Sequence, residues 1–313
     1  MSLEQLIKQT NAYKIIRSEK RFGALSHAYL VIVDDGEYLR RYLNVFARLI
    51  MCGEEDFCGV CRACRLIEKE KYADCTFYPA ESGSILTADV EDVICQSYIK
   101  PLENSTRLFV LCGAENMNAA AQNKILKTLE EPPENVVILM GATSDHQLLP
   151  TIKSRVKRLE IPPFGESALT EFLKEKFTDE DKIARAVSLC GGKASAAVRY
   201  CENGNGETAY ALARSVLDNM KTSRDVLRYA SEINKDNISD FINALEQETA
   251  KLYRLAIHSG AGEANGFKTG ALVGITDMLA EMRRRLNFNA NAQMTADGIL
   301  FGILEEKYKW QKL

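Results

Sequence analysis

The chain has 313 residues, of which 46% are hydrophobic and 27% charged, a balance typical of a globular protein of two or three domains. Its longest apolar stretches, 28–33 and 136–140, are far shorter than the ~20 residues of a membrane helix, and charged residues interrupt the N-terminal segment where a signal peptide has its apolar core. With 40 basic and 43 acidic residues, the chain lacks the basic character of an autonomous nucleic-acid binder. We expect a cytoplasmic globular protein without a membrane partner.

Short β-rich runs alternate with helix-like segments in the first half of the chain. The predicted strands are Ala28–Val33, Cys75–Tyr78, Leu108–Gly113, Val136–Ala142 and Val156–Ile161. Helical patterns lie between them, for example at Tyr38–Met51 and at Asn118–Glu131, which a Pro-Pro pair ends. Strands separated by helix-length segments indicate a parallel sheet of βαβ units, so we predict an α/β domain over residues 1–164.

From Glu166 onward the sequence shows no convincing strand. A small helical unit is predicted over 165–205, closing in a turn-rich link at 203–206 (Asn-Gly-Asn-Gly). Longer helices follow over 206–313, where apolar residues recur at helical spacing within 238–257 and 272–286. The predicted plan is an α/β domain, a small helical domain and an all-α C-terminal domain.

Four of the nine cysteines fall close together, at Cys52, Cys58, Cys61 and Cys64. A C-x2-C step lets two thiolates from one tight turn converge on a tetrahedral zinc ion, and here two such steps share Cys61. Four thiolate ligands leave no open coordination position, so the predicted zinc site is structural. Two other interpretations are that Cys61 and Cys64 are simply buried on one helix face, and that one C-x2-C pair is a redox pair. The redox pair lacks the expected strand context.

Several segments together resemble the bacterial clamp-loader ATPases of the AAA+ family. Residues 23–30 resemble the entry to the first core strand of those proteins, and 123–133 (Asn-Lys-Ile-Leu-Lys-Thr-Leu-Glu-Glu-Pro-Pro) the segment after their second nucleotide motif. Residues 148–156 are similar to the region that carries their Ser-Arg-Cys motif, with Val156 in the cysteine position. The four-cysteine module occurs in the same group, and 283–289 resemble collar helices.

This resemblance implies an AAA+ fold in three parts. Residues 1–164 would form the α/β domain, with the zinc module inserted at 52–64. Residues 165–205 would form a small helical lid domain, and 206–313 a helical collar domain through which subunits assemble.

The nucleotide motifs of the family are missing from this chain. A phosphate-binding loop needs G-x4-G-K-[ST] after the first strand, whose amides and lysine hold the phosphates. The residues found there are Asp34, Asp35, Gly36 and Glu37. The metal-holding acidic pair of the second motif falls on Cys112 and Gly113, and the lid's sensor arginine falls on Ala194. We therefore expect that the chain neither binds nor hydrolyses ATP.

A clamp-loader subunit without nucleotide motifs resembles the stator branch of the family, which belongs to DNA polymerase III. The resemblance implies delta and ATP-hydrolysing gamma/tau subunits as ring partners, and indirect work on the sliding clamp and primer-template DNA. It also implies that Arg155, next to Ser154, reaches the ATP held by a neighbouring subunit, because an arginine supplied in trans stabilises phosphoryl-transfer charge.

Other interpretations have their own signatures. An ATP-hydrolysing gamma/tau-type motor would need an intact phosphate loop, and a zinc-bearing nucleic-acid-binding protein would bind DNA by itself. Arg155 could instead cap the end of its strand. The three arginines at 283–285 fit a solvated helix face or a subunit contact better than a DNA-binding site. The histidines at 27, 146 and 258 have no clustered partners, so none is assigned a catalytic role.

Overall fold

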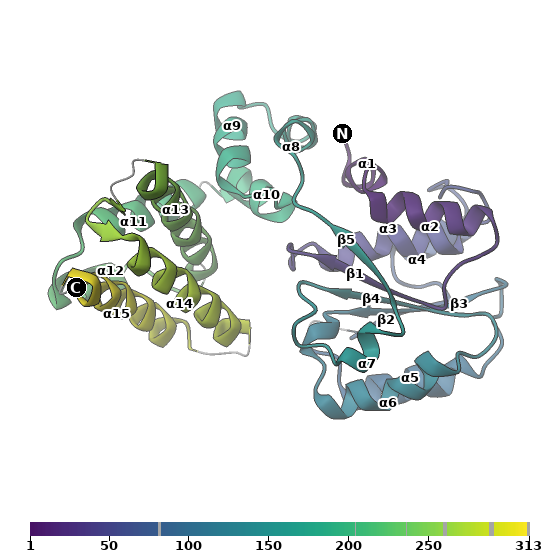
Figure 1. Ribbon diagram of the computed structural model, residues 1–313. Coiled ribbons are helices and arrows are strands. Elements are labelled where there is room, and N and C mark those ends of the chain that lie inside the picture. The colour runs from purple at the N-terminus through teal and green to yellow at the C-terminus, as the bar shows by residue number, and fades with distance from the viewer. Residues whose placement is uncertain (81–82, 204, 236, 259–261, 288–290, 312–313) are drawn as a thin grey trace. The chain divides into compact units, whose positions relative to one another are not determined.

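The computed structural model describes residues 1–80, 83–203, 205–235, 237–258, 262–287 and 291–311 (Figure 1). It forms two compact units. The first comprises Met1–Lys176 and Gly192–Ser195, and the second Phe177–Gly191 and Ala196–Leu313. The domain boundaries expected near 164 and 205 stay a prediction.

A five-stranded parallel sheet is the centre of the first unit, as predicted. Its strands are β1 (Ala28–Val33), β2 (Cys75–Tyr78), β3 (Arg107–Cys112), β4 (Val136–Ala142) and β5 (Lys157–Ile161), in the order β2-β3-β4-β1-β5. β3 ends one residue before the predicted Gly113, which has a left-handed φ of 79° that extended backbone does not allow. β5 begins at Lys157, one residue later than predicted.

Helices cover both faces of this sheet (Figure 1). On one face lie α1 (Leu3–Lys8), α2 (Asn11–Arg21), α3 (Leu39–Met51) and α4 (Arg62–Glu68). On the other lie α5 (Thr87–Ser97), α6 (Ala119–Glu130) and α7 (Pro150–Lys153). A 3-10 helix, η1 (Ala114–Asn116), follows β3, and α8 (Glu166–Lys174) follows β5.

The sequence of β1 explains its central position. All six of its side chains are buried, which suits a parallel strand covered on both faces. Ala28, Leu30 and Ile32 belong to the apolar cluster on the side of α5 and α6. β1 lies between β4 and β5. From β1 the chain continues to β2, β3 and β4 on one side of β1, and after β4 it passes to β5 on the other side. Such a switch point opens a crevice at the carboxyl ends of the strands, where α/β proteins place their ligands.

A substitution at Gly141 of β4 would test how α3 packs on the sheet. A Cβ at this position would lie 2.5 Å from Leu43 Cδ1 and 3.0 Å from Leu39 Cδ1. Both leucines are buried, so Gly141→Ala is expected to lower the free energy of unfolding by about 1–3 kcal/mol, measured by urea denaturation. Gly165→Ala is the control, because no atom lies within 4 Å of that Cβ, and a smaller loss of less than about 1 kcal/mol is expected, since Ala is a poorer N-cap of α8 than Gly. Equal effects of the two changes would contradict this packing.

The second unit is mainly helical. Its elements are α9 (Glu180–Leu189), α10 (Ala194–Asn203, whose first two residues belong to the first unit), α11 (Asn205–Asn219), α12 (Ser223–Ala230), α13 (Ile238–His258), β6 (Glu263–Ala264), β7 (Phe267–Lys268), α14 (Thr269–Asn287) and α15 (Ala292–Gln311). Apolar side chains from α11 to α15 form one core cluster. Among the described residues no helix is long and apolar enough to cross a membrane.

One expectation for this unit was wrong. β6 and β7 form an antiparallel hairpin where no strand was predicted, since strands of two residues are too short to show an alternating pattern. Their turn uses Asn265 and Gly266, both with positive φ, as tight hairpins require. At the link predicted over 203–206, α10 ends at Asn203 and α11 begins at Asn205. Residue 204 lies outside the described residues.

The two predicted apolar stripes are confirmed, with one exception. Ile238, Phe241, Ile242 and Leu245 of α13 are buried in the core, as are Leu272, Ile275 and Leu279 of α14. Leu255, predicted as part of the α13 stripe, is 53% exposed.

Candidate functional site

The four clustered cysteines converge in space. Their sulfur atoms all lie within 4.8 Å of one another, with Cys52 Sγ 3.8 Å from Cys58 Sγ and 3.9 Å from Cys61 Sγ. A tetrahedral zinc ion with Zn–S bonds of 2.3 Å holds its sulfurs about 3.8 Å apart. The cluster can therefore hold a metal ion, and its donor set and spacing fit structural zinc.

The end of α3 and the start of α4 position three of these thiols. Cys52 directly follows α3, while Cys61 is the N-cap of α4 and Cys64 lies in its first turn. The backbone amide of Cys61 donates to Cys58 Sγ at 3.3 Å, and that of Cys64 donates to Cys61 Sγ at 3.4 Å. Amide donors from Cys61 and Val60 lower the pKa of the Cys58 thiol to about 6. A metal needs thiolates, so these donors favour the ligand form of Cys58, whereas burial raises the pKa of the Cys64 thiol.

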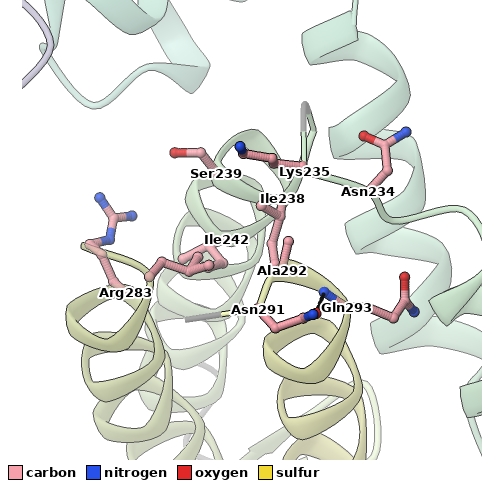
Figure 2. Close-up of a pocket in the computed structure, with 10 residues that line it drawn as sticks. Asn234, Lys235, Ile238, Ser239, Ile242, Arg283, Asn291, Ala292 and Gln293 are labelled. Atoms are coloured by element: carbon pink, nitrogen blue, oxygen red, sulfur yellow. Dashed lines mark hydrogen bonds between the residues drawn. The ribbon is translucent and has the colours of Figure 1, made fainter. Parts of the chain in front are cut away.

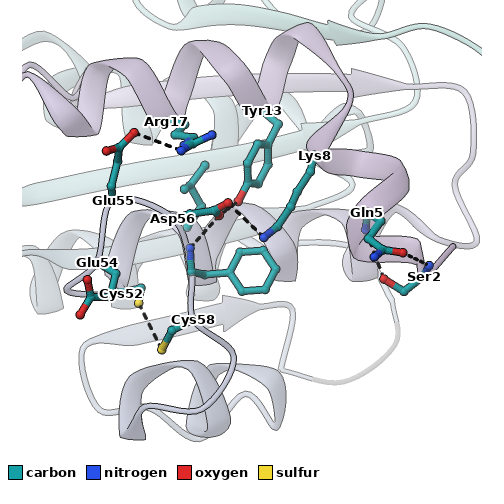
Figure 3. A network of polar contacts seen from close by, with 12 residues as sticks. Ser2, Gln5, Lys8, Tyr13, Arg17, Cys52, Glu54, Glu55, Asp56 and Cys58 are labelled. Carbon is teal, nitrogen blue, oxygen red and sulfur yellow. Dashed lines mark hydrogen bonds and ion pairs between the residues drawn. The ribbon is translucent and has the colours of Figure 1, made fainter.

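The N-terminal helices hold the loop that leads into the cluster (Figure 3). Asp56 accepts hydrogen bonds from Tyr13 Oη and from Lys8 Nζ at 3.1 Å, and also from the amide of Phe57 at 2.8 Å. Lys20 Nζ donates to the carbonyl oxygen of Cys52 at 2.6 Å. The loop between α3 and α4 is thus fastened by contacts that do not require a metal.

Carboxylates follow the carboxyl end of β1. Asp34 is exposed and forms an ion pair with Lys193 at 2.9 Å. Asp35 is buried and accepts hydrogen bonds from Tyr42 Oη at 2.7 Å, from the amide of Ser195 at 3.1 Å and from Ser195 Oγ. Two of the three donors to Asp35 therefore come from the segment around the predicted sensor position, where Ala194 is buried.

The end of β3 lies at the same edge of the sheet. Cys112 is partly exposed, and burial of its thiol raises its pKa to about 12. Just beyond Gly113, Glu115 is buried and accepts hydrogen bonds from the amide and the hydroxyl of Thr143, at 2.8 and 2.6 Å. Thr143 Cγ2 would lie 3.1 Å from a Cβ at Gly36. The loops after β1 and β4 therefore lie close together at this edge.

Arg155 lies between α7 and β5, with its side chain 33% exposed. Its Nη2 forms an ion pair with Glu130 Oε1 at 2.7 Å, and its Nη1 donates to the carbonyl of Thr151 at 2.8 Å and to Ser154 Oγ at 3.1 Å. Glu130 was not anticipated from the sequence. Val156, the substituted motif position, is buried in the apolar cluster on the α5–α6 side of the sheet, where a hydrophobic side chain fits.

Other residues singled out in the sequence form no site within the described chain. The histidines at 27, 146 and 258 are exposed, and none joins the clustered metal-ligating groups. A cavity of about 650 Å³ opens between α13, α14 and the start of α15 (Figure 2). Arg283 lines it, but its guanidinium donates to Asn243 and to Glu246 at 2.6 Å, so its charge is already paired within the unit.

Comparisons with known proteins find similarity to subunits of DNA polymerase III. Residues 8–165 match the family described as DNA polymerase III, delta subunit. DNA polymerase III subunit delta' of Haemophilus influenzae is 31% identical over 187 residues, which cover 58% of this chain and 57% of that protein. DNA polymerase III subunit tau of Escherichia coli is 26% identical over 274 residues, which cover 86% of this chain and 39% of tau.

A solved structure of a DNA polymerase III gamma subunit-related protein from Thermotoga maritima covers 97% of this chain and 98% of that one, with a TM-score of 0.44 and 20% identity. The chain spans about half the length of the delta' relatives it matches, 57%, 55% and 52% in three cases.

Proposed function

Because this chain belongs to the DNA polymerase III delta-subunit family, with delta' subunits among its relatives, we propose that it is the non-catalytic stator subunit of a bacterial clamp loader. Its ring partners would be delta and gamma/tau subunits, and the ring would load the sliding clamp onto primer-template DNA. In this proposal the parallel sheet is the core of an AAA+ domain, residues 165–205 are its lid and 206–313 its collar.

The observation that supports a non-catalytic role is the charge of the loop after β1. A nucleotide-binding loop offers backbone amides and a lysine to the phosphates. Here two aspartates occupy the loop, and Lys193 and Ser195 of the same chain bind them. Polyphosphate would meet negative charge at this position, and the acidic pair expected at the end of β3 is replaced by Cys112 and Gly113.

The alternative function is that of a gamma/tau-type motor. Tau proteins of two species are similar to the chain, at 26% and 24% identity. A motor, however, hydrolyses ATP through the lysine and the acidic pair that this chain lacks. The loss of both motifs favours the stator.

Arg155 is proposed to act on the ATP of a neighbouring subunit. Its guanidinium is oriented by Thr151, Ser154 and Glu130 close to the protein surface. An exposed ion pair is worth about 0–1 kcal/mol, so exchanging Glu130 for a phosphate costs little. Ser154 is proposed to orient the arginine.

We further propose that Cys52, Cys58, Cys61 and Cys64 hold one structural zinc ion. When bound, zinc would cross-link the end of α3 to the start of α4. With four thiolates it keeps no position for substrate or water.

Assembly is the direct test of the proposed function. The chain is mixed with delta and gamma/tau subunits, and the mass of the product is measured by light scattering after size-exclusion chromatography. A discrete ring-sized complex is expected only when all components are present. A chain that elutes alone in every mixture would contradict the stator assignment.

The isolated chain is expected to show no ATP binding in calorimetric titrations with Mg²⁺ present. The physical reason is repulsion between phosphate and the carboxylates of Asp34 and Asp35, with no loop lysine to compensate. A gamma/tau subunit titrated in the same buffer is the positive control. Saturable binding in the micromolar range would show that the chain is not the proposed nucleotide-free subunit.

A further inference from the structure

The buried carboxylate of Asp35 accepts hydrogen bonds from a segment that lies far away in the sequence. Asp35 is 4% exposed, and its Oδ2 accepts from Tyr42 Oη at 2.7 Å and from the amide of Ser195 at 3.1 Å. Its Oδ1 accepts from Ser195 Oγ. A buried carboxylate is costly unless such donors satisfy it, so these contacts and the burial of Asp35 depend on each other.

Neighbours of Ser195 are bound to the same unit by separate contacts. Lys193 pairs with Asp34 at 2.9 Å, and the amide of Phe164 donates to the carbonyl of Gly192 at 3.0 Å. Gly192 has a φ of 81°, and a Cβ there would lie 2.5 Å from Pro163 Cβ. This close approach is open to glycine alone without displacement of the neighbouring chain. Gly192, Lys193 and Ser195 thus each have their own attachment.

These contacts reverse the polarity of a phosphate-binding loop. The backbone amides of a phosphate-binding loop donate hydrogen bonds to a bound anion. In the loop after β1, by contrast, the two aspartates are the anions, and they bind Lys193 and two hydrogen-bond donors of Ser195. The segment they bind is also the place where the chain enters the first unit, at Gly192, and leaves it again, after Ser195. Contacts of Asp34 and Asp35 with Lys193 and Ser195 therefore hold the segment through which the chain enters and leaves the first unit.

We propose that Asp34 and Asp35 form an internal anchor that holds Gly192–Ser195 on the α/β unit without nucleotide. The degenerate loop then has a positive role, because its aspartates keep the connecting segment in one position whatever the ATP concentration. Asp35 is the main residue of the anchor, since it is buried and has three donors. Asp34 adds a more exposed ion pair of smaller weight. This inference does not depend on the clamp-loader assignment.

Hydrogen exchange of the full chain, followed by mass spectrometry, tests the anchor. Ser195→Ala removes one donor to Asp35 and is expected to speed amide exchange in residues 192–196 about fivefold to tenfold, with exchange in β1 and β4 unchanged. Asp35→Asn is expected to act on the same segment, and the double variant to add little to the single ones. Ser188→Ala is the matched control, because this exposed serine of α9 donates only to the local carbonyl of Arg185 and should change nothing in 192–196.

Two results would overturn the proposal. In the first, Ser195→Ala and Asp35→Asn leave exchange in 192–196 at the parental rate. In the second, Mg²⁺-ATP slows exchange in this segment of the parental chain, which would make nucleotide its ligand. If Asp35→Asn does not fold, Ser195→Ala and Lys193→Ala still decide the question, since both change residues at the segment and leave the buried carboxylate in place. Assembly of the ring is measured separately, so the stator assignment and the anchor can fail independently.

Discussion

Arg155→Ala is expected to lower ATP turnover at the neighbouring subunit's site by on the order of 10³ in the assembled clamp loader, because the developing charge on the γ-phosphate loses its partner. The loss in total turnover will be smaller, since other sites in the ring stay intact. The free energy of unfolding should change by less than about 1 kcal/mol, since Arg155 is partly exposed and forms one surface ion pair. Steady-state ATPase measurements with clamp and primed DNA give the result.

Two variants sharpen this experiment. Arg155→Lys keeps the charge but loses the planar fork, so it should restore only part of the activity. Arg158→Ala is the matched control, because Arg158 is a nearby surface arginine paired with Asp145 and Glu160, and its loss should leave turnover unchanged. If a clamp loader that contains Arg155→Ala assembles and its neighbouring subunit hydrolyses ATP at the parental rate, the side chain only holds α6 and α7 together through Glu130 and Thr151.

Removal of the metal is expected to unfold the cysteine module locally and to leave the sheet intact. Protein purified without chelator should contain one zinc per chain, and Cys61→Ser should contain far less. Structural zinc binding is worth on the order of 10 kcal/mol in small peptides, which is ample to order the loop between α3 and α4. In the variant, amide exchange should rise across 58–68 and change less across 52–57, whose contacts with Lys8, Tyr13 and Lys20 do not require the metal, while the sheet signal in circular dichroism stays.

Acid should release the metal, because protons compete with zinc for the four thiolates. The pKa of Cys58, about 6, lies below that of an ordinary thiol. The contribution of the Cys58 thiolate to the stability of the folded turn is therefore fully present above the ordinary thiol pKa and is lost as the pH falls toward 6. Cys95→Ser is the control, since this exposed cysteine lies outside the cluster and its loss should leave zinc content unchanged. A metal-free parental protein with four free thiols would contradict the site.

Local patterns in the sequence determined the sheet and the cysteine cluster. β1 and β4 are continuous apolar runs, and such runs between helix-length segments have few solutions other than a buried parallel sheet. The four cysteines lie within one short loop, so their spacing already limits how far apart their sulfurs can be. In both cases the residues that interact are close in the chain or repeat with a period of secondary structure.

Only the tertiary structure revealed what the degenerate loop binds. Asp34 and Asp35 could be recognised as unsuited to phosphate, but Lys193 and Ser195 follow about 160 positions later, and no local periodicity links them. The same holds for Glu130, which α6 brings to Arg155 across 25 positions of chain. The hairpin of β6 and β7 escaped prediction for the opposite reason: two residues per strand are too few for a pattern. Partners of surface charges depend on how helices and loops pack around the sheet, and packing is decided by the whole chain.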